Sequence, residues 1–242
     1  MSTDTADTPP TLDPGVSVIV TAYNEAAQIG ATLDALAATF PGAPVWVADD
    51  GSTDATSRLA REAGARVVRS ERMIGKGGAA TPAARDALRE AGAAVPGRNQ
   101  ELIFVLLDAD LGDSASELGA LADAVRRGDT DIAVAAFATR VGGGVGLAVG
   151  FARWAIRRRS GLSLRAPISG QRALRASALQ DVLPFAHGFG MEIGMTIDAA
   201  RAGHRIAEIE LPLSHRATGR TLSGFLHRGR QLVDFVRVYL AR

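Results

Sequence analysis

Apolar runs alternate with amphipathic stretches along the first 137 residues. Five short runs rich in β-branched and other apolar residues are typical of buried strands. They cover residues 16–20, 45–48, 67–68, 102–107 and 131–137. Four stretches between them have apolar residues at helical spacing, and they lie within residues 24–40, 55–64, 77–92 and 114–128. This alternation predicts an α/β fold with a Rossmann-like, mostly parallel sheet and helices on both of its faces.

The regular alternation of strands and helices ends after residue 140, and local sequence motifs add detail before that point. Ser114 and Glu117 have the spacing of a capping box at the start of the fourth helix. Further along, a Gly-rich start leads into a basic amphipathic stretch, followed by two segments that each predict a turn and a helix, one strand and a last amphipathic helix. These segments are residues 141–167, 169–179, 188–203, 204–213 and 222–242. We expect a smaller second region built from them within one domain.

The composition of the chain excludes some classes of protein but does not identify a binding partner. The chain has 242 residues, of which 47% are hydrophobic, so residues 16–242 can bury the core of a single domain. Residues 1–15 are polar and Pro-rich, which predicts a disordered tail and not a signal peptide. The net charge of +1 gives no indication of nucleic acid as a partner, and the absence of cysteine excludes disulfides and thiolate chemistry. The sequence contains no run of 18 uncharged apolar residues, which a membrane-spanning helix would require, so we expect a cytoplasmic protein.

Acidic and polar residues follow three of the predicted strands. They are Asn24-Glu25, Asp49-Asp50 and Asp108-Ala109-Asp110. In open α/β sheets, ligands bind outside the carboxyl ends of the strands, so these clusters mark a candidate site. An Asp-x-Asp string there offers the oxygen ligands that Mg²⁺ or Mn²⁺ prefers, and such ions keep positions for substrate phosphates.

Gly75-Lys76-Gly77-Gly78 opens the third predicted helix. Glycines there allow backbone N–H groups to approach an anion closely, and the lysine adds a positive charge. A flexible turn with a solvated lysine explains the same residues, and both interpretations stay open. The spacing is not that of a Walker A loop, and no strand is followed by the glycine pattern of dinucleotide-binding folds.

Four of these stretches, taken together, resemble a known family. "VIVTAYNEAAQIGATLDAL", "VADDGSTDAT", "IGKGGAATPAARDA" and "LLDADL" occur in the order and at the intervals of the nucleotide-sugar half of family 2-type glycosyltransferases of the GT-A fold. The resemblance covers residues 16–111 and leaves 112–242 as the acceptor-side half. "SGQRAL", "GFGMEIGMTID" and "SHRATGR" add a looser similarity to glucosyl-3-phosphoglycerate synthases and to dolichol-phosphate-mannose-synthase-like enzymes.

The resemblance implies roles for residues on the nucleotide side. Ala22, Tyr23 and Glu25 would line the pocket for the base and the ribose. Asp49, with Asp50 beside it, would accept a hydrogen bond from the uracil imide.

The resemblance also implies the diphosphate and metal sites. Lys76 would lie near the base or the diphosphate, and Asp110 would be the main ligand of Mg²⁺ or Mn²⁺. Asp108 would contact the ribose or the metal, and His215 matches a histidine that completes the metal site in the phosphoglycerate enzymes. A neutral imidazole among the ligands suits Mn²⁺ better than Mg²⁺.

Candidate residues on the acceptor side are one glutamate and three arginines. Glu192 could deprotonate the acceptor or bind a sugar hydroxyl, and a helix-capping or salt-bridged glutamate is the structural alternative. Arg172, Arg216 and Arg220 are candidates for binding an anionic acceptor. The chain lacks the acidic pair typical of inverting relatives in this region, which favours a retaining reaction.

We therefore expect a metal-dependent hexosyltransferase that moves glucose from a UDP-sugar to a small, anionic acceptor. An alternative acceptor is a polyprenyl phosphate at the inner membrane face. Residues 150–162, with Trp154 beside three arginines, would then lie at the lipid interface, although a solvated basic helix face explains them equally well. A nucleotidyltransferase is disfavoured because no basic, Gly-rich loop follows the first strand. A non-catalytic sugar-nucleotide-binding module is disfavoured because the aspartates and His215 are intact, and the sequence leaves a homodimer open.

Overall fold

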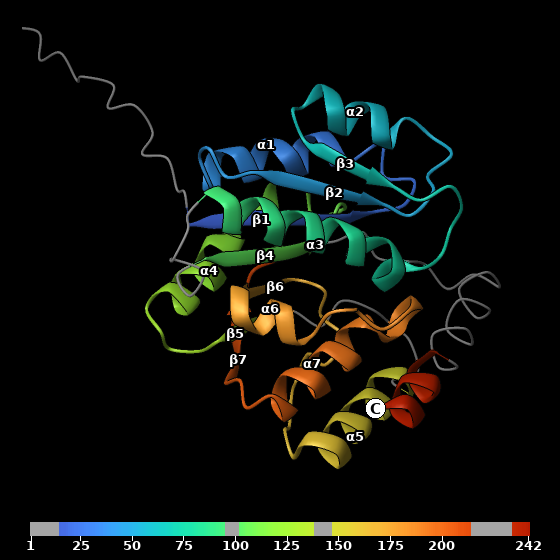
Figure 1. The fold of residues 1–242 in the computed structure, drawn as a ribbon, viewed down its shortest axis with the longest axis vertical. Coiled ribbons are helices and arrows are strands. Elements are labelled where there is room, and N and C mark those ends of the chain that lie inside the picture. Colours follow the sequence, from blue (N-terminus) through green and yellow to red (C-terminus); the bar gives the residue numbers. More distant parts are fainter. Residues whose placement is uncertain (1–14, 95–101, 138–146, 214–233) are drawn as a thin grey trace, which may run out of the picture.

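A seven-stranded sheet forms the centre of the protein in the computed structural model, which describes residues 15–94, 102–137, 147–213 and 234–242 (Figure 1). The strands are β1 (Val16–Ala22), β2 (Val45–Asp49), β3 (Arg66–Arg69), β4 (Ile103–Asp108), β5 (Ile132–Phe137), β6 (Arg172–Arg175) and β7 (Ile206–Leu211). The helices are α1 (Ile29–Thr39), α2 (Thr56–Glu62), α3 (Lys76–Ala94), α4 (Gly119–Arg126), α5 (Leu147–Ser160), α6 (Ala176–Asp181) and α7 (Met191–Arg201). Two 3₁₀ helices, η1 (Gly112–Leu118) and η2 (Gly188–Gly190), and a helix over residues 234–241 complete the described elements.

The strands lie in the order β3-β2-β1-β4-β6-β5-β7. Neighbouring strands are parallel except at β6, which runs antiparallel to both β4 and β5. The predicted α/β class and mostly parallel sheet are confirmed. The prediction of only a turn and a helix over residues 169–179 is wrong, because β6 occupies four of these residues before α6 begins.

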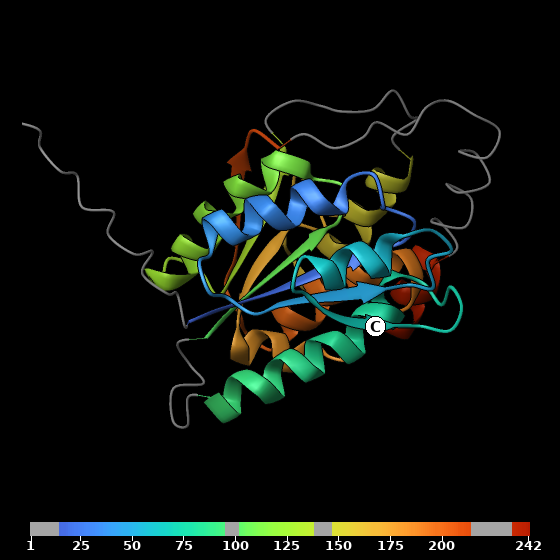
Figure 2. The same ribbon diagram turned by 90° about the horizontal axis from the view of Figure 1, so that it is seen from above.

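Helices cover both faces of the sheet, as predicted (Figure 2). The α1 and α4 helices, blue and yellow-green in Figure 2, lie on one face, and α3 and α6 lie on the other. The β1 strand shows why its residues are apolar without alternation: Val18 and Val20 belong to the core on the first side, and Ile19 to the core on the second. A strand buried on both faces has no position for a polar side chain at its centre.

A third apolar cluster extends the molecule beyond the second face. It joins α5 and α7 with the helix over residues 234–241, and it includes Ile156, Ile193 and Phe235. Only part of the chain after residue 140 forms this cluster, because β6 and β7 join the central sheet. None of the described helices is both long and apolar enough to cross a membrane.

The predicted capping box is wrong. Ser114 lies inside η1, whose N-cap residue is Leu111, and its hydroxyl donates a hydrogen bond to the carbonyl of Leu111 at 2.7 Å. The segment predicted as one helix is divided into η1 and α4.

Candidate functional site

The carboxyl ends of three neighbouring strands bring the predicted acidic residues together. In the sheet register Ala22 at the end of β1 is paired with Asp49 of β2, and Thr21 is paired with Asp108 of β4. The hydroxyl of Thr21 donates a hydrogen bond to Asp108 Oδ1 at 2.8 Å. The strand ends therefore place two of the three acidic clusters on either side of β1, as the sequence predicts.

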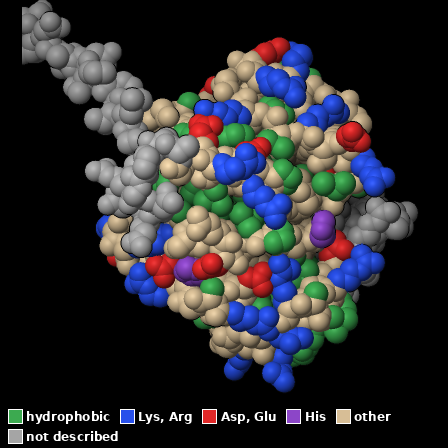
Figure 3. Space-filling view, viewed as in Figure 1, with side chains coloured by type: hydrophobic (Ala, Val, Ile, Leu, Met, Phe, Trp, Pro, Cys, Tyr) green, Lys and Arg blue, Asp and Glu red, His purple; other side chains and the backbone are tan. Residues whose placement is uncertain are grey.

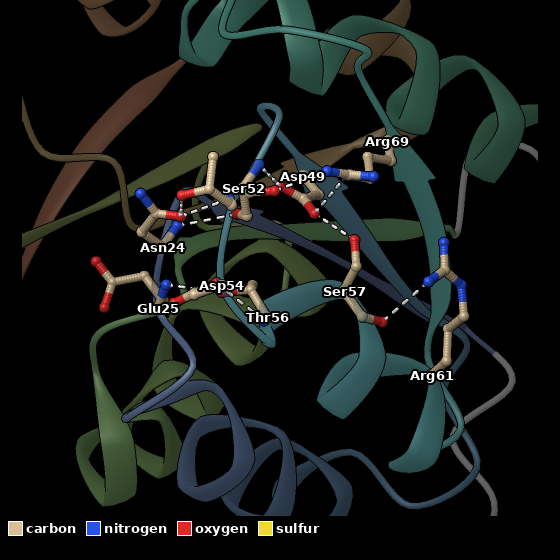
Figure 4. A network of polar contacts seen from close by, with 10 residues as sticks. Asn24, Glu25, Asp49, Ser52, Asp54, Thr56, Ser57, Arg61 and Arg69 are labelled. Atoms are coloured by element: carbon tan, nitrogen blue, oxygen red, sulfur yellow. Dashed lines mark hydrogen bonds and ion pairs between the residues drawn. The ribbon is translucent and has the colours of Figure 1, made fainter.

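The loops after β1 and β2 are joined by a network of hydrogen bonds, shown in Figure 4. Asn24 adopts a left-handed backbone conformation (φ 56°), which asparagine tolerates better than most residues. Its backbone N–H donates to Ser52 Oγ at 2.9 Å, and its side-chain oxygen accepts from the backbone N–H of Thr53 at 2.8 Å. The N–H of Glu25 donates to Thr56 Oγ1 at 2.8 Å. These contacts fix the two loops to each other beside the strand ends.

Asp49 is fully buried beneath this network. Its carboxylate accepts hydrogen bonds from the N–H of Ser52 at 2.8 Å and from the hydroxyl of Ser57, and Arg69 Nε lies 3.5 Å away. The structure thus gives Asp49 three protein partners. Its contact with a uracil ring stays a prediction.

Asp50 shapes the segment that leads into α3. Its carboxylate accepts hydrogen bonds from the N–H groups of Ile74 at 2.7 Å and Gly75 at 2.9 Å. Burial raises the pKa of Asp50, and these two hydrogen bonds oppose the rise. Asp50 therefore positions the residue that follows, Lys76, at the start of α3.

Lys76 is held between two carboxylates from distant parts of the chain. Its Nζ lies 2.6 Å from Asp108 Oδ1 and 2.8 Å from Glu192 Oε1, and a fifth of its side chain is exposed. Burial alone would lower the pKa of Lys76, but the charges of Asp108 and Glu192 outweigh it and raise the pKa above its ordinary value. The interpretation of Lys76 as a solvated lysine in a flexible turn is therefore wrong.

The same ion pair determines the charge state of Asp108. Burial alone would raise the pKa of Asp108, but the ammonium group of Lys76 holds it below its ordinary value, helped by hydrogen bonds from Thr21 and Gln171. The Gln171 side-chain amide donates to Asp108 Oδ2 at 3.1 Å. Both carboxylate oxygens of Asp108 thus have protein partners.

Glycines let three segments close around Lys76. A Cβ atom added to Gly170, in the turn before β6, would lie 2.4 Å from Lys76 Nζ and 2.8 Å from Asp108 Oδ2. A Cβ atom added to Gly77 would lie 1.8 Å from the carbonyl oxygen of Ala186. The glycine at 77 therefore has a packing reason in addition to the predicted approach of an anion.

Asp110 follows in a turn that α1 holds from the side. The buried hydroxyl of Thr32 donates to the carbonyl of Ala109 at 2.8 Å and accepts from the N–H of Gly112 at 2.9 Å. These two bonds fix the backbone on both sides of Asp110, which is half-buried. Thr32 was not a predicted site residue, because a threonine inside an amphipathic helix gives no sequence signal of such a contact.

The donor atoms at this edge fit a divalent cation in chemical type. Carboxylate oxygens are the ligands that Mg²⁺ and Mn²⁺ prefer. Asp108 already accepts hydrogen bonds from Lys76, Thr21 and Gln171, so a cation bound there would compete with these partners. In the described part of the chain no three His, Asp or Glu side chains lie close enough to hold an ion. The assignment of a metal to Asp110, Asp108 and His215 stays a prediction.

Arg172 does not lie where an acceptor-binding arginine would. Its side chain is fully buried, and its guanidinium donates to the carbonyl of Ser169 at 2.9 Å and to Thr196 Oγ1 at 3.0 Å. Burial lowers the pKa of Arg172 to about 10, against the charges of Glu192 and Glu208, which raise it. The guanidinium joins the turn before β6 to α7, so it positions Gly170 and Gln171 on one side of Lys76 and Glu192 on the other.

The remaining predicted residues lie at the rim or outside the described residues. Ala22 is buried at the end of β1, and Tyr23, next to it, is 43% exposed. His215, Arg216 and Arg220 lie outside the described residues. Sequence reasoning gave no role to Thr21 or Gln171, although Gln171 stands in the "SGQRAL" string that carried the resemblance to relatives.

Comparisons with known proteins identify the family of this chain. The profile of glycosyl transferase family 2 matches residues 17–183. An undecaprenyl-phosphate mannosyltransferase of Micrococcus luteus is 31% identical, in an alignment that covers 93% of this chain and 94% of the relative.

Solved structures of glucosyl-3-phosphoglycerate synthase from Mycobacterium tuberculosis are similar in fold. One, in complex with Mg²⁺ and UDP, has a TM-score of 0.70 and is 28% identical, and the aligned region covers 93% of this chain and 78% of the synthase chain. Another, with Mn²⁺, UDP and phosphoglyceric acid, has a TM-score of 0.69 at 30% identity and covers 93% of this chain and 77% of its own. The predicted GT-A fold and the predicted enzyme class are confirmed. The chain belongs to glycosyl transferase family 2 and is a nucleotide-sugar-dependent glycosyltransferase.

Proposed function

We propose that this enzyme transfers glucose from UDP-glucose to a small acceptor that carries an anionic group, with the help of Mg²⁺ or Mn²⁺. The observation that carries the proposal is the position of Lys76, held by Asp108 and Glu192 next to the turn that contains Asp110. This arrangement places a cation and carboxylates at one edge of the sheet, where parallel α/β folds bind ligands. Structural relatives in complex with UDP, UDP-glucose and Mn²⁺ support the choice of donor and metal.

The nucleotide would lie along the loops after β1 and β2. Tyr23 offers an exposed aromatic ring at the rim, and the network around Asn24 and Ser52 holds both loops rigid. We propose that the uracil ring stacks near Tyr23 and that Asp49 accepts a hydrogen bond from its imide. Asp49 would reach the ring from beneath Ser52, so this contact requires a rearrangement of its present hydrogen bonds.

The reaction breaks the bond between the anomeric carbon and the diphosphate oxygen and forms one to an acceptor oxygen. The diphosphate leaves with the bonding electron pair and gains negative charge, which the fixed ammonium group of Lys76 would stabilise. A divalent cation bound by Asp110 would add positive charge at the same diphosphate. The proton of an acceptor hydroxyl passes to the departing phosphate oxygen if the configuration is retained, or to Glu192 if it is inverted.

Glu192 has a second proposed role, at the transferred sugar. It is 6% exposed, and it lies at the start of α7 with its carboxylate directed at Lys76. This contact fits the proposal that Glu192 binds a hydroxyl of the transferred sugar. The predicted alternative of a salt-bridged glutamate is compatible with that role, because the ion pair orients the carboxylate toward the site.

Turnover with defined donors and acceptors tests the proposal. UDP-glucose and Mn²⁺ would be incubated with a panel of small phosphorylated hydroxy acids, and the products identified by mass and by the NMR coupling of the anomeric proton. A glucosylated acid and free UDP are expected, with turnover lost in Asp110→Asn and kept in the matched control Asp113→Asn. Turnover of GDP-mannose but not of UDP-glucose would overturn the donor assignment.

A polyprenyl phosphate is the second candidate acceptor. The observation in its favour is the Micrococcus luteus undecaprenyl-phosphate mannosyltransferase, which aligns over 94% of its length. The same assay with undecaprenyl phosphate in detergent distinguishes the two. A lipid-linked sugar, without a product from any small acid, would replace the first proposal with the second.

A further inference from the structure

One end of the molecule carries an unusual combination of exposed aromatic and basic side chains. The α5 helix and residues 234–242 lie side by side there, since Trp154 and Tyr239 have ring centroids 4.8 Å apart and Arg159 donates to the Tyr239 carbonyl at 2.7 Å. We call this surface the α5 face. It is formed by Arg153, Trp154, Arg157, Arg158, Tyr239 and Leu240.

The apolar part of the α5 face is large for side chains in contact with water. Trp154 is 51% exposed and Leu240 is 73% exposed. Phe151 packs against both Trp154 and Tyr239, so three aromatic rings form one group at the surface. Trp and Tyr combine an apolar ring with a polar atom, and they are enriched where an apolar phase meets water.

The charge of the α5 face has one sign. Arg153, Arg157 and Arg158 are exposed, and α5 contains no acidic residue. Figure 3 shows Lys and Arg side chains gathered over the lower end of the molecule, where α5 lies in Figure 1. On α4, by contrast, exposed Arg126 is paired with Asp123. Arg157 and Arg158 form no ion pair with any of the described residues, so their charges are available to an outside partner.

We propose that the α5 face docks on the surface of an anionic lipid bilayer. Aromatic rings can enter the headgroup region while arginines bind lipid phosphates, which is how basic amphipathic helices bind membranes. A second copy of the chain is a poorer partner. A two-fold contact through this face would bring the same patch together with itself and place arginines against arginines.

The inner side of the α5 face packs directly on the candidate site. Ile156 of α5 and Phe235 share a cluster with Ile193, the residue after Glu192. A Cβ atom added to Gly190 would lie 2.2 Å from Val238 Cγ2, so the C-terminal helix lies flush on the segment that begins α7. Docking through the α5 face therefore keeps the helix that carries Glu192 one layer away from the bilayer. The inference goes beyond the proposed function, because lipid binding requires neither donor nor acceptor.

Vesicle co-sedimentation of the full chain tests the proposal without any measurement of activity. Vesicles of phosphatidylcholine alone would be compared with vesicles that also contain phosphatidylglycerol, at low and at high salt. We expect binding only to the anionic vesicles, weakened by salt. The double variant Arg157→Gln/Arg158→Gln should lower the partition coefficient roughly 25-fold, at about fivefold for each arginine near the surface.

Matched variants make the result specific. Arg126→Gln/Arg127→Gln removes the same charge from two consecutive exposed arginines at the end of α4. This variant should leave binding within about twofold of the wild type, because α4 lies away from α5 (Figure 1). Trp154→Ala should weaken binding while thermal unfolding shows that the fold is kept. Equal losses in both arginine double variants, or no preference for anionic vesicles, would overturn the proposal. So would a dimer in solution that dissociates in the Arg157/Arg158 variant without any binding to vesicles, since the α5 face would then be a contact between copies.

Discussion

Replacement of Lys76 by methionine isolates the central electrostatic feature of the site. Lys76 is the only lysine in the chain, and it is the cation that contacts both Asp108 and Glu192. Methionine has a similar length and no charge, so Lys76→Met leaves two poorly solvated carboxylates without their counter-ion.

The expected cost follows from the burial of the three side chains. Removal of one partner from a buried ion pair costs about 3–5 kcal/mol. Here Glu192 is only 8% exposed at its side chain, but Asp108 is 35% exposed and Lys76 21%. Water therefore compensates part of the loss, and we expect Lys76→Met to lower the free energy of unfolding by about 2–3 kcal/mol at neutral pH.

Urea denaturation followed by circular dichroism measures this change. With a slope of about 2–3 kcal/mol per molar urea, the midpoint should fall by about 1 M. The double variant Lys76→Met/Glu192→Gln should recover part of the lost stability, because it removes one of the two uncompensated charges, while turnover stays low. A midpoint within about 0.2 M of the wild type for Lys76→Met would show that the ion pair contributes little to stability, and a double variant whose losses simply add would show that the unpaired Glu192 carboxylate is not the cause of the loss.

Three further predictions concern neighbouring features. The new methyl group of Gly170→Ala would meet only the flexible end of Lys76 and the tip of Asp108. We therefore expect this variant to change the free energy of unfolding by less than about 1 kcal/mol but to reduce turnover about 10- to 100-fold, because it displaces these two side chains. Gly30→Ala, whose methyl group meets no atom within 4 Å, is the control in both assays. Asp131→Asn should lower the free energy of unfolding by about 1 kcal/mol at neutral pH. Hydrogen bonds from Arg205 hold the pKa of Asp131 below its ordinary value, so the difference between variant and wild type should vanish in acid, where the wild-type carboxylate is protonated. A difference in urea midpoint that stays constant across pH would contradict this prediction. Acetylation of Lys76 at about pH 9 should be slow in the native protein and fast after unfolding or in Asp108→Asn, because the two carboxylates keep the pKa of Lys76 raised. Mass spectrometry of the peptide that contains Lys76 measures these rates, and the opposite order would contradict the prediction.

The strand ends could be predicted from the sequence because each depends on a local pattern. An apolar run that stops at a carboxylate, as at Leu107-Asp108, indicates both the strand and its polar end. Parallel pairing then places such ends at one edge, as the register of Thr21 with Asp108 confirms. Lys76, the first residue of α3, lies at the same edge because the loop after the parallel strand β3 leads into this helix.

The contacts that depend on distant segments could not be predicted. A four-residue strand that begins with an arginine has no strand pattern, and β6 exists because β4 and β5 provide partners on both sides. Arg172 was therefore predicted to bind an anionic acceptor, whereas hydrogen bonds to Ser169 and Thr196 stabilise its buried guanidinium. The contact of Thr32 with the turn at Asp110 spans 77 residues along the chain to Ala109, and no local pattern reports it.

Calorimetric titration with UDP, UDP-glucose and GDP-mannose, each with and without Mn²⁺, is the most direct test for a nucleotide-sugar site at this edge of the sheet. We expect UDP and UDP-glucose to bind more tightly with Mn²⁺ than without it. Asp110→Asn should abolish this difference while it unfolds at the same urea concentration as the wild type. No binding of any of the three nucleotides, or binding of UDP that neither Mn²⁺ nor Asp110→Asn alters, would contradict the assignment of a metal-assisted nucleotide-sugar site to the carboxyl edge of the sheet.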